Sequence, residues 1–255
     1  MRQRNLRLGS TLCSATAKVL PAVALAASLG TASSAQIVSY DPALGTLPQA
    51  QGFTYVQAFT AAPQPVVAGG TLHQGPTAYD GLQYWPKSDV PINYGNGFFV
   101  EATLKVTYST YFPDPPNAQG QRFGWYLDVT DASGHEFTLG VASGGIAVNT
   151  DLFGSPTNGV PFTAFDTTDA FHTYRVVVAQ GVGSVYIDNT LYGTTPIGAA
   201  IGTSFANRVF FGDGTREGDS QTELSGLRYG PVPEPSTFLV LAIGAGLCRR
   251  LRSRR

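Results

Sequence analysis

Apolar and polar residues alternate along several stretches of the chain, and the alternation has a period of two. It is clearest over residues 98–107 and 125–130, where every second residue is apolar. In the first stretch these residues are Phe98, Val100, Ala102, Leu104 and Val106, and in the second they are Trp125, Leu127 and Val129. Because successive side chains of a strand point to opposite faces, the pattern predicts β-strands with one buried face. We therefore expect Trp125 to lie in the core.

The second half of the chain carries the signals of a β-hairpin. Residues 174–178 and 184–188 are rich in β-branched and aromatic side chains, and the glycine-containing segment 179–183 joins them. This arrangement predicts two antiparallel strands connected by a short loop. A second turn is expected at 188–190, where Asn189 can adopt the left-handed conformation.

Residues 36–230 show no sustained helical spacing of apolar residues, no fixed repeat and no internal linker, while 30 glycines and 17 prolines punctuate the chain. Short strands at this spacing predict an all-β fold, and we expect a single jelly-roll β-sandwich over residues 36–230. The two cysteines, Cys13 and Cys248, lie outside this range. About 195 residues are enough to bury a core without disulfides.

Charge is unevenly distributed along the chain. Residues 36–230 hold seven basic and sixteen acidic residues, a formal charge of −9, although the whole chain has a net charge of −1. Nucleic-acid affinity depends on neutralising phosphates with cationic side chains. An acidic domain of this kind is therefore not expected to bind DNA or RNA.

The N-terminal 35 residues have the form of a secretory signal peptide. Four basic residues precede or open an apolar stretch at 19–29, and the small residues Ser33, Ser34 and Ala35 follow it. This order predicts export by the general secretory machinery, cleavage after Ala35 and a mature start at Gln36. Cys13 precedes the apolar stretch and lacks the surroundings of a lipidation site.

The C-terminal residues have a three-part organisation. The triplet Pro233, Glu234 and Pro235 precedes an apolar run at 238–247, which is followed by five arginines at 249–255. Arginines beside an apolar run stay on the cytoplasmic side, so the domain is expected outside and the tail inside. Ten helical residues span about 15 Å, whereas the hydrocarbon layer measures about 30 Å. The run therefore favours a transient membrane anchor.

This C-terminal region resembles the PEP-CTERM sorting signal of Gram-negative bacteria, which has the same triplet, apolar helix and arginine cluster in the same order. The resemblance covers about the last 24 residues. It implies processing near the triplet by an exosortase-type protease, localisation at the cell surface or outside the cell, and a biofilm or exopolysaccharide setting. An ordinary membrane tail anchor is the alternative.

A second resemblance concerns the middle of the chain. Residues 171–178 and 185–189 look like the paired late strands of laminin-G-like domains in the concanavalin A-like lectin/glucanase superfamily. Residues 98–105 look like an earlier strand of that fold, and residues 208–215 like its closing segment. The resemblance implies a jelly roll over most of residues 36–230. It leaves function open, because this fold carries lectins, glycosidases and passive spacers.

Catalytic groups are sparse in the sequence. Glycoside hydrolysis requires two carboxylates that flank the scissile bond. The Glu-x-Asp-x-x-Glu run of glucanases with this fold is absent, and no G-x-S-x-G motif occurs. Glu101 and Asp128 lie on the polar faces of their predicted strands, so they could meet on one sheet, although we interpret them as solvated carboxylates. We therefore predict no catalytic residues.

Two candidate ligand sites remain. Asp213, Asp219 and Glu223 fall in one glycine-containing acidic segment and form a candidate Ca²⁺ site, with an ordinary acidic surface loop as the alternative. Tyr84 and Trp85 precede Pro86 in a predicted loop and are candidate glycan contacts. The three histidines, His73, His135 and His172, lack metal-type spacing, and His172 is interpreted as the first residue of a strand.

These observations favour an exported, non-catalytic surface or matrix protein with a lectin-like domain that binds glycans or exopolysaccharide. A polysaccharide-active glycoside hydrolase or lyase of the same fold is the alternative, and a purely structural role also stays open.

Overall fold

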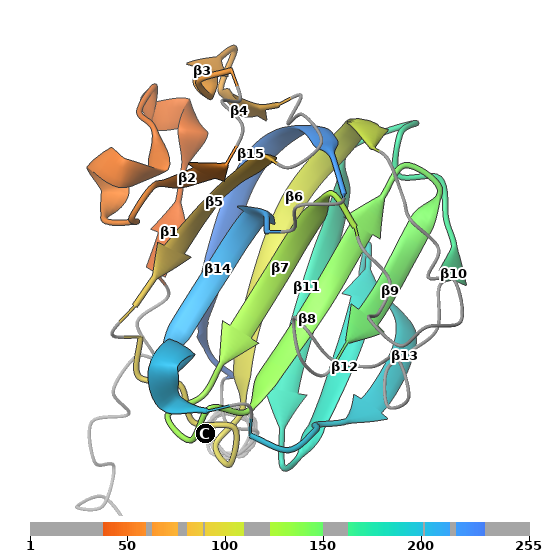
Figure 1. Cartoon of the computed structure of the whole chain (residues 1–255). Helices are drawn as coiled ribbons and strands as arrows, with labels where there is room; N and C mark the ends of the chain where they lie inside the picture. Colours follow the sequence, from red (N-terminus) through yellow and green to blue (C-terminus); the bar gives the residue numbers. More distant parts are fainter. Residues whose placement is uncertain are drawn as a thin grey trace, which may run out of the picture. The chain divides into compact units, whose positions relative to one another are not determined.

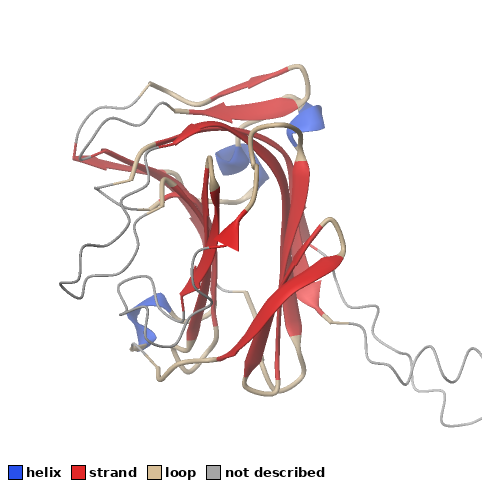
Figure 2. Cartoon of the chain, turned by 90° about the vertical axis from the view of Figure 1, so that its right-hand side faces the viewer, coloured by secondary structure: helices blue, strands red, loops and turns tan. Residues whose placement is uncertain are grey.

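The described part of the chain is a β-sandwich. A computed structural model describes residues 38–59, 63–75, 81–88, 90–109, 123–149, 163–200, 202–214 and 218–232. Two antiparallel sheets face each other (Figures 1 and 2), which confirms the predicted all-β sandwich. The expected signal peptide at 1–35, its cleavage site at Ala35 and the triplet at 233–235 lie outside the described residues.

One sheet has eight strands. Its order is β13 (Thr190–Pro196), β12 (Val182–Ile187), β11 (His172–Ala179), β6 (Phe98–Ser109), β15 (Ser220–Pro231), β4 (Thr71–Gln74) and β3 (Val66–Ala68). The eighth strand, β1 (Val38–Tyr40), pairs with the last part of β15. The two twelve-residue strands β6 and β15 lie side by side at the centre of this sheet.

The other sheet has seven strands. Its order is β10 (Thr163–Ala164), β9 (Gly145–Asn149), β8 (Glu136–Ala142), β7 (Trp125–Thr130), β14 (Arg208–Asp213), β5 (Gly81–Lys87) and β2 (Val56–Phe59). In the described connections lie three short 3-10 helices, η1 (Pro42–Leu44), η2 (Pro48–Gln51) and η4 (Thr203–Phe205).

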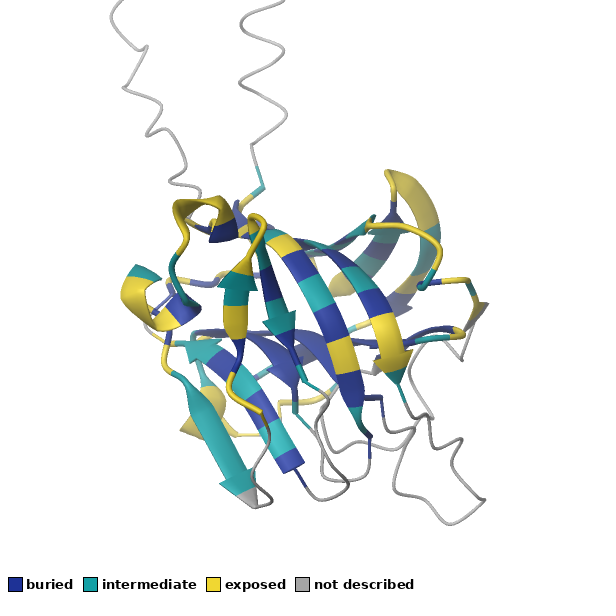
Figure 3. Ribbon diagram, turned by 90° about the horizontal axis from the view of Figure 1, so that it is seen from above, coloured by how far each residue is buried: buried dark blue, intermediate teal, exposed yellow. Residues whose placement is uncertain are grey.

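The core fills the space between the two sheets. Alternate residues of β6 and β7 point into it, as the sequence pattern predicts, and Trp125 is only 1% exposed. Figure 3 shows the resulting alternation of buried and more exposed residues along the strands of the eight-stranded sheet. A stack of Tyr40, Phe211 and Trp85 extends the core, with ring centroids 6.1 and 5.3 Å apart.

The predicted hairpin is present, with a tighter loop than expected. Strands β11 and β12 pair from Tyr174 opposite Ile187 to Ala179 opposite Val182. Only Gln180 and Gly181 lie between the strands, and both have positive φ angles of 51° and 79°. This is the backbone that two-residue hairpin turns require. The turn between β12 and β13 also has two residues with positive φ angles, 50° at Asp188 and 66° at Asn189.

The outer face of the seven-stranded sheet is also buried. Every residue of β7, β8 and β14 is buried, including those that point away from the core. A second apolar cluster forms on this outer face from Phe123, Tyr126, Ala142, Ala147 and Phe210. Polar groups on this face therefore require partners within the protein.

Candidate ligand-binding site

Glu101 and Asp128 do not meet. Glu101 lies on β6 of the eight-stranded sheet, whereas Asp128 lies on β7 of the seven-stranded sheet. The expectation that they could share a sheet is wrong, because the chain changes sheets between β6 and β7. Their interpretation as solvated carboxylates is also wrong, since Glu101 is 7% exposed and Asp128 is 0% exposed.

Asp128 belongs to a buried polar network that we call the Arg208 network, formed by Asp128, Thr130, Glu136, Thr138 and Arg208. The hydroxyls of Thr130 and Thr138 donate to the two Asp128 carboxylate oxygens at 3.3 and 2.8 Å. Nη2 of Arg208 lies 3.4 Å from Asp128 Oδ1 and 3.6 Å from Glu136 Oε1. The network joins three adjacent strands, β8, β7 and β14.

The guanidinium of Arg208 is held from several sides. The ring of Phe205 lies over it at 4.3 Å, and the Phe210 ring is 5.6 Å away. Both oxygens of Asp128 already accept hydrogen bonds from protein groups. A carboxylate satisfied in this way serves packing and strand pairing and is poorly placed to attack or protonate a substrate.

Glu101 occupies the outer face of the eight-stranded sheet. Its carboxylate accepts a hydrogen bond from Nε of Arg228 at 2.6 Å, and Nε of Arg175 lies 4.0 Å away. A hollow of about 290 Å³ opens beside this pair, lined in part by Ser39, Thr103 and Ser225. Two of the charged side chains that line this hollow, Glu101 and Arg228, pair with each other.

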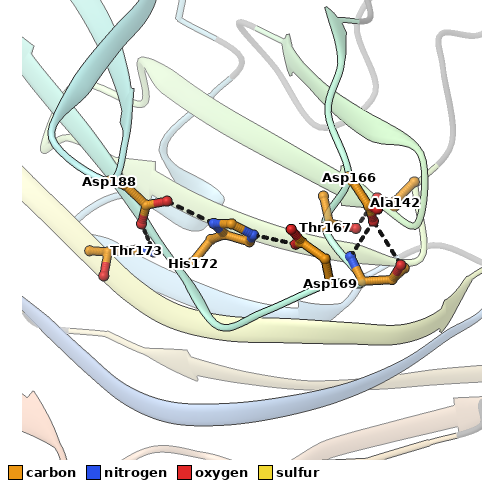
Figure 4. Close-up of polar contacts among 8 residues, drawn as sticks. Ala142, Asp166, Thr167, Asp169, His172, Thr173 and Asp188 are labelled. Atoms are coloured by element: carbon orange, nitrogen blue, oxygen red, sulfur yellow. Dashed lines mark hydrogen bonds and ion pairs between the residues drawn. The ribbon is translucent and has the colours of Figure 1, made fainter.

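A different polar cluster lies where the segment before β11 meets the turn between β12 and β13. We call it the His172 cluster; it consists of Asp166, Asp169, His172 and Asp188 (Figure 4). Nδ1 of His172 lies 2.7 Å from Asp188 Oδ2, and Nε2 lies 2.8 Å from Asp169 Oδ1. Each ring nitrogen thus faces a carboxylate. Both contacts are hydrogen bonds only when both nitrogens carry protons, which is the cationic form of histidine.

The pKa values agree with this geometry. Burial by itself would lower the pKa of His172, but the hydrogen bonds and negative charges of Asp169 and Asp188 together raise it above its ordinary value. For Asp188, burial opposes ionisation, whereas the backbone N–H of Thr173 and the contact with His172 favour it, so that its pKa is lowered. The cluster therefore favours the protonated form of His172 and the ionised form of Asp188.

A hollow of about 480 Å³ lies next to the His172 cluster. It is lined by Ser143, Gly144, Ala164, Phe165 and Asp166. The Phe165 ring meets the rings of His172 and Tyr192 edge-on, with centroids 4.7 and 5.6 Å apart. These contacts fix the orientation of a half-buried aromatic ring at the wall of the hollow.

The loop that carries Phe165 and Asp166 is pinned to the sandwich. The Phe165 N–H donates to the Gly144 carbonyl at 3.2 Å, and the Thr167 hydroxyl donates to the Ala142 carbonyl at 2.7 Å. Asp166 Oδ1 accepts hydrogen bonds from the hydroxyl and the N–H of Thr168 at 2.7 and 2.9 Å. These bonds lower the pKa of Asp166, so that it is an ionised acceptor at neutral pH.

The predicted aromatic contacts are only partly accessible. Trp85 is 0% exposed and packs in the core, and its indole N–H donates to Gln49 Oε1 at 3.2 Å. Its interpretation as a surface residue is wrong, because residues 81–87 form strand β5 and Trp85 occupies an inward position. Tyr84 points to the other face, where it is half-buried against Phe210.

The candidate calcium ligands are not brought together. Among the described residues, no three His, Cys, Asp or Glu side chains group as a metal ion would require. Asp213 is buried at the end of β14, whereas Glu223 lies within β15 and faces His73 at 3.7 Å. Asp219 precedes β15.

The His172 cluster was not predicted, although His172 does begin strand β11 as expected. The sequence contained one signal for this cluster, because the register of the predicted hairpin places Asp188 next to Thr173. The partner Asp169 belongs to a loop without any pattern.

The fold and the C-terminus together define a class of protein. The PEP-CTERM protein-sorting motif matches residues 231–255, as predicted. The chain thus combines a β-sandwich with a C-terminal motif that implies export and exosortase-type processing. Such a signal implies a position at the cell surface or the membrane in Gram-negative bacteria. No helix among the described residues is long and apolar enough to span a membrane.

Solved structures with the same fold are numerous. A conserved carbohydrate esterase of the Shiga toxin-encoding bacteriophage phi24B is 13% identical, with a TM-score of 0.55, and the match covers 78% of this chain and all of that chain. A sialidase is 11% identical, with a TM-score of 0.51, and the match covers 77% of this chain and 18% of that one. At these identities the likeness concerns the fold. No curated protein sequence matches the chain significantly.

Proposed function

We propose that the protein is an exported surface or matrix protein whose jelly roll binds carbohydrate without cleaving it. The binding site is the hollow beside Phe165 and Asp166. One observation carries this proposal. An oriented aromatic ring, an ionised carboxylate and a serine all line one hollow of about 480 Å³.

Sugars require such a combination. Their hydroxyl groups donate hydrogen bonds to carboxylates, and their apolar C–H faces pack on aromatic rings. Phe165 is held by two neighbouring rings, and the loop around it is pinned by backbone and side-chain bonds. A site that is already ordered loses little conformational entropy when its ligand binds.

His172 and Asp128 are poorly placed to act as general bases. A general base needs a free nitrogen or oxygen within hydrogen-bond reach of the substrate. Both nitrogens of His172 face carboxylates, and both oxygens of Asp128 accept hydrogen bonds from the Arg208 network. The chemistry named for similar folds, a carbohydrate esterase and a sialidase, supports a carbohydrate as the ligand.

The test is binding of the secreted protein to a panel of neutral and acidic oligosaccharides, measured by calorimetry alongside release of reducing ends. Phe165→Ala and Asp166→Asn should each weaken binding at least about tenfold, which corresponds to about 1.4 kcal/mol.

Asp41→Asn is the matched control. Asp41 also accepts a backbone hydrogen bond two residues ahead, from Ala43 at 2.9 Å, but it lies outside the hollow. This variant should bind like the wild type. Release of reducing ends would favour the glycoside hydrolase alternative, and equal binding by all variants would show that the hollow is not the site.

A further inference from the structure

The sandwich continues without a spacer into the sorting motif. Strand β15 runs to Pro231, and the N–H of the next residue, Val232, donates to the Gly97 carbonyl at 3.1 Å. The Pro-Glu-Pro triplet begins at the following position, residue 233. No residue therefore separates this described contact with the folded domain from the triplet.

The end of β15 is paired on both sides. Tyr229, Gly230 and Pro231 lie opposite Val100, Phe99 and Phe98 of β6. On the other side, β1 pairs with Tyr229 through Val38. Tyr229 is 1% exposed, so detachment of the strand end would bring a buried aromatic side chain into water.

Val232 rests against a corner built by two turns. Gly97 ends the first turn with a φ angle of 84°, and a Cβ atom at Gly97 would lie 3.2 Å from Cβ of Val232. The Tyr94 carbonyl accepts hydrogen bonds from Gly97 at 3.3 Å and from Gln180, in the second turn, at 2.9 Å. Glycine at residue 97 thus supplies both the backbone conformation and the room that Val232 needs.

This corner is uncharged. Residues 91–97 and 179–182 contain no Asp, Glu, Lys or Arg, although residues 36–230 carry a formal charge of −9. A partner that approaches the triplet at the membrane surface would meet neutral turns. Anionic lipid headgroups would find no acidic side chain on these two turns to repel them.

We propose that the folded sandwich limits processing of its own sorting signal, because the residues just before the triplet are held in β15 against this neutral corner. The partner is the membrane-bound sorting protease, which breaks one peptide bond near the triplet. The acyl carbon passes to water or to another nucleophile, and the released amine takes up a proton. This inference rests on the sorting motif and is independent of carbohydrate binding.

The physical reason is that the protease and the folded domain compete for the same backbone groups. Proteins that bind an extended peptide often do so through its main-chain N–H and C=O groups. In the native domain residues 229–231 pair with β6, Tyr229 also pairs with β1, and the Val232 N–H donates to Gly97. When opening is fast relative to cleavage, proteolysis follows the population of the opened form. The rate of processing is then proportional to the fraction of molecules whose strand end is detached.

The experiment uses the full-length chain in a host that contains the sorting protease, with processing followed by pulse-chase. A Gly-Ser-Gly-Ser insert between Val232 and Pro233 should shorten the half-time of processing about threefold or more. The same insert between Gly69 and Gly70, in the exposed β3–β4 turn, is the control and should leave it unchanged. An equal or longer half-time with the first insert would overturn the proposal, as would processing of that variant in a host without the protease.

A point variant tests the same contact without changing the length of the chain. Gly97→Ala places a Cβ atom against Val232 and should accelerate processing. Gly45→Ala imposes comparable backbone strain, at a φ angle of 70°, but has nothing within 4 Å of the added Cβ. If both variants are processed at the same rate, the contact of Val232 with Gly97 does not limit the protease, and the proposal fails.

Discussion

Replacement of Arg208 should destabilise the fold strongly, because it is the cation of a buried network. Its guanidinium contacts Asp128 and Glu136, whose side chains are both 0% exposed, while its own side chain is 10% exposed. Arg208→Met keeps an apolar stem but removes the cation that faces the buried carboxylates of Asp128 and Glu136. Breaking a buried ion pair in this way costs about 3–5 kcal/mol. For a domain of this size, that loss lowers the melting temperature by about 6–20 °C.

The assay is urea unfolding of the secreted protein, with the midpoint and slope compared between variants. A lower midpoint at an unchanged slope reports a change in stability. Glu223→Gln is the control, since it removes a half-exposed contact with His73 at 3.7 Å and should cost less than about 1 kcal/mol. The charge-free combination of Asp128→Asn, Glu136→Gln and Arg208→Met should recover much of the loss, because the charges that face one another are then removed together. A loss below about 1 kcal/mol for Arg208→Met, or a combination less stable than the single variant, would refute this reasoning.

Three further predictions concern the core, the His172 cluster and the sorting signal. Leu104→Ala, in the middle of β6, should cost about 2–5 kcal/mol in urea unfolding while the far-UV spectrum stays that of a β-protein; a loss near zero would contradict the assigned core. Because the folded-state pKa of His172 is raised, its stabilising effect should be complete below the unfolded pKa of 6.5 and disappear as the pH rises through the folded value. The melting-temperature difference between the wild type and His172→Gln should therefore shrink from pH 6 to pH 9, and a constant difference would show that protonation is irrelevant. At the acidic end, the contribution of Asp188, whose pKa is lowered, should fade as the pH falls below 3.8. Alanine at all three positions of the triplet 233–235 should leave an unprocessed form in the membrane fraction, and normal maturation in a host with the protease would argue against the sorting signal.

The strands could be predicted from the sequence because their cause is local. A strand with one face on the core must place an apolar residue at every second position, and residues 98–107 and 125–130 do so. The hairpin of β11 and β12 was equally accessible, since glycine and β-branched residues mark its turn and strands. The pattern does not say which sheet a strand joins. That choice separates Glu101 from Asp128, and it depends on contacts between strands far apart in the sequence.

Trp85 shows how a local signal can mislead. The sequence Tyr84-Trp85-Pro86 suggests a loop, because proline cannot donate a hydrogen bond to a sheet. In the structure Pro86 is the sixth of the seven residues of β5, and its carbonyl accepts a hydrogen bond from Thr54 at 2.9 Å. A proline near the end of a strand interrupts little of the ladder. Alternation therefore sends Trp85 inward to Phe211, whereas Tyr84 faces outward.

The His172 cluster could be predicted from the sequence only in part. Once the β11–β12 turn is limited to Gln180 and Gly181, the pairing of Tyr174 with Ile187 follows, and Asp188 comes to lie beside Thr173 and His172. Half of the cluster is thus a consequence of hairpin register, which sequence reasoning can reach. Asp169 is three residues from His172 in the chain, but its contact depends on how the loop from Phe165 is pinned to Ala142 and Gly144 on the other sheet. The proposed site at the hollow therefore needs both sheets to be in place, and this is why a pattern within single strands predicts the fold but not the place where we propose that a ligand binds.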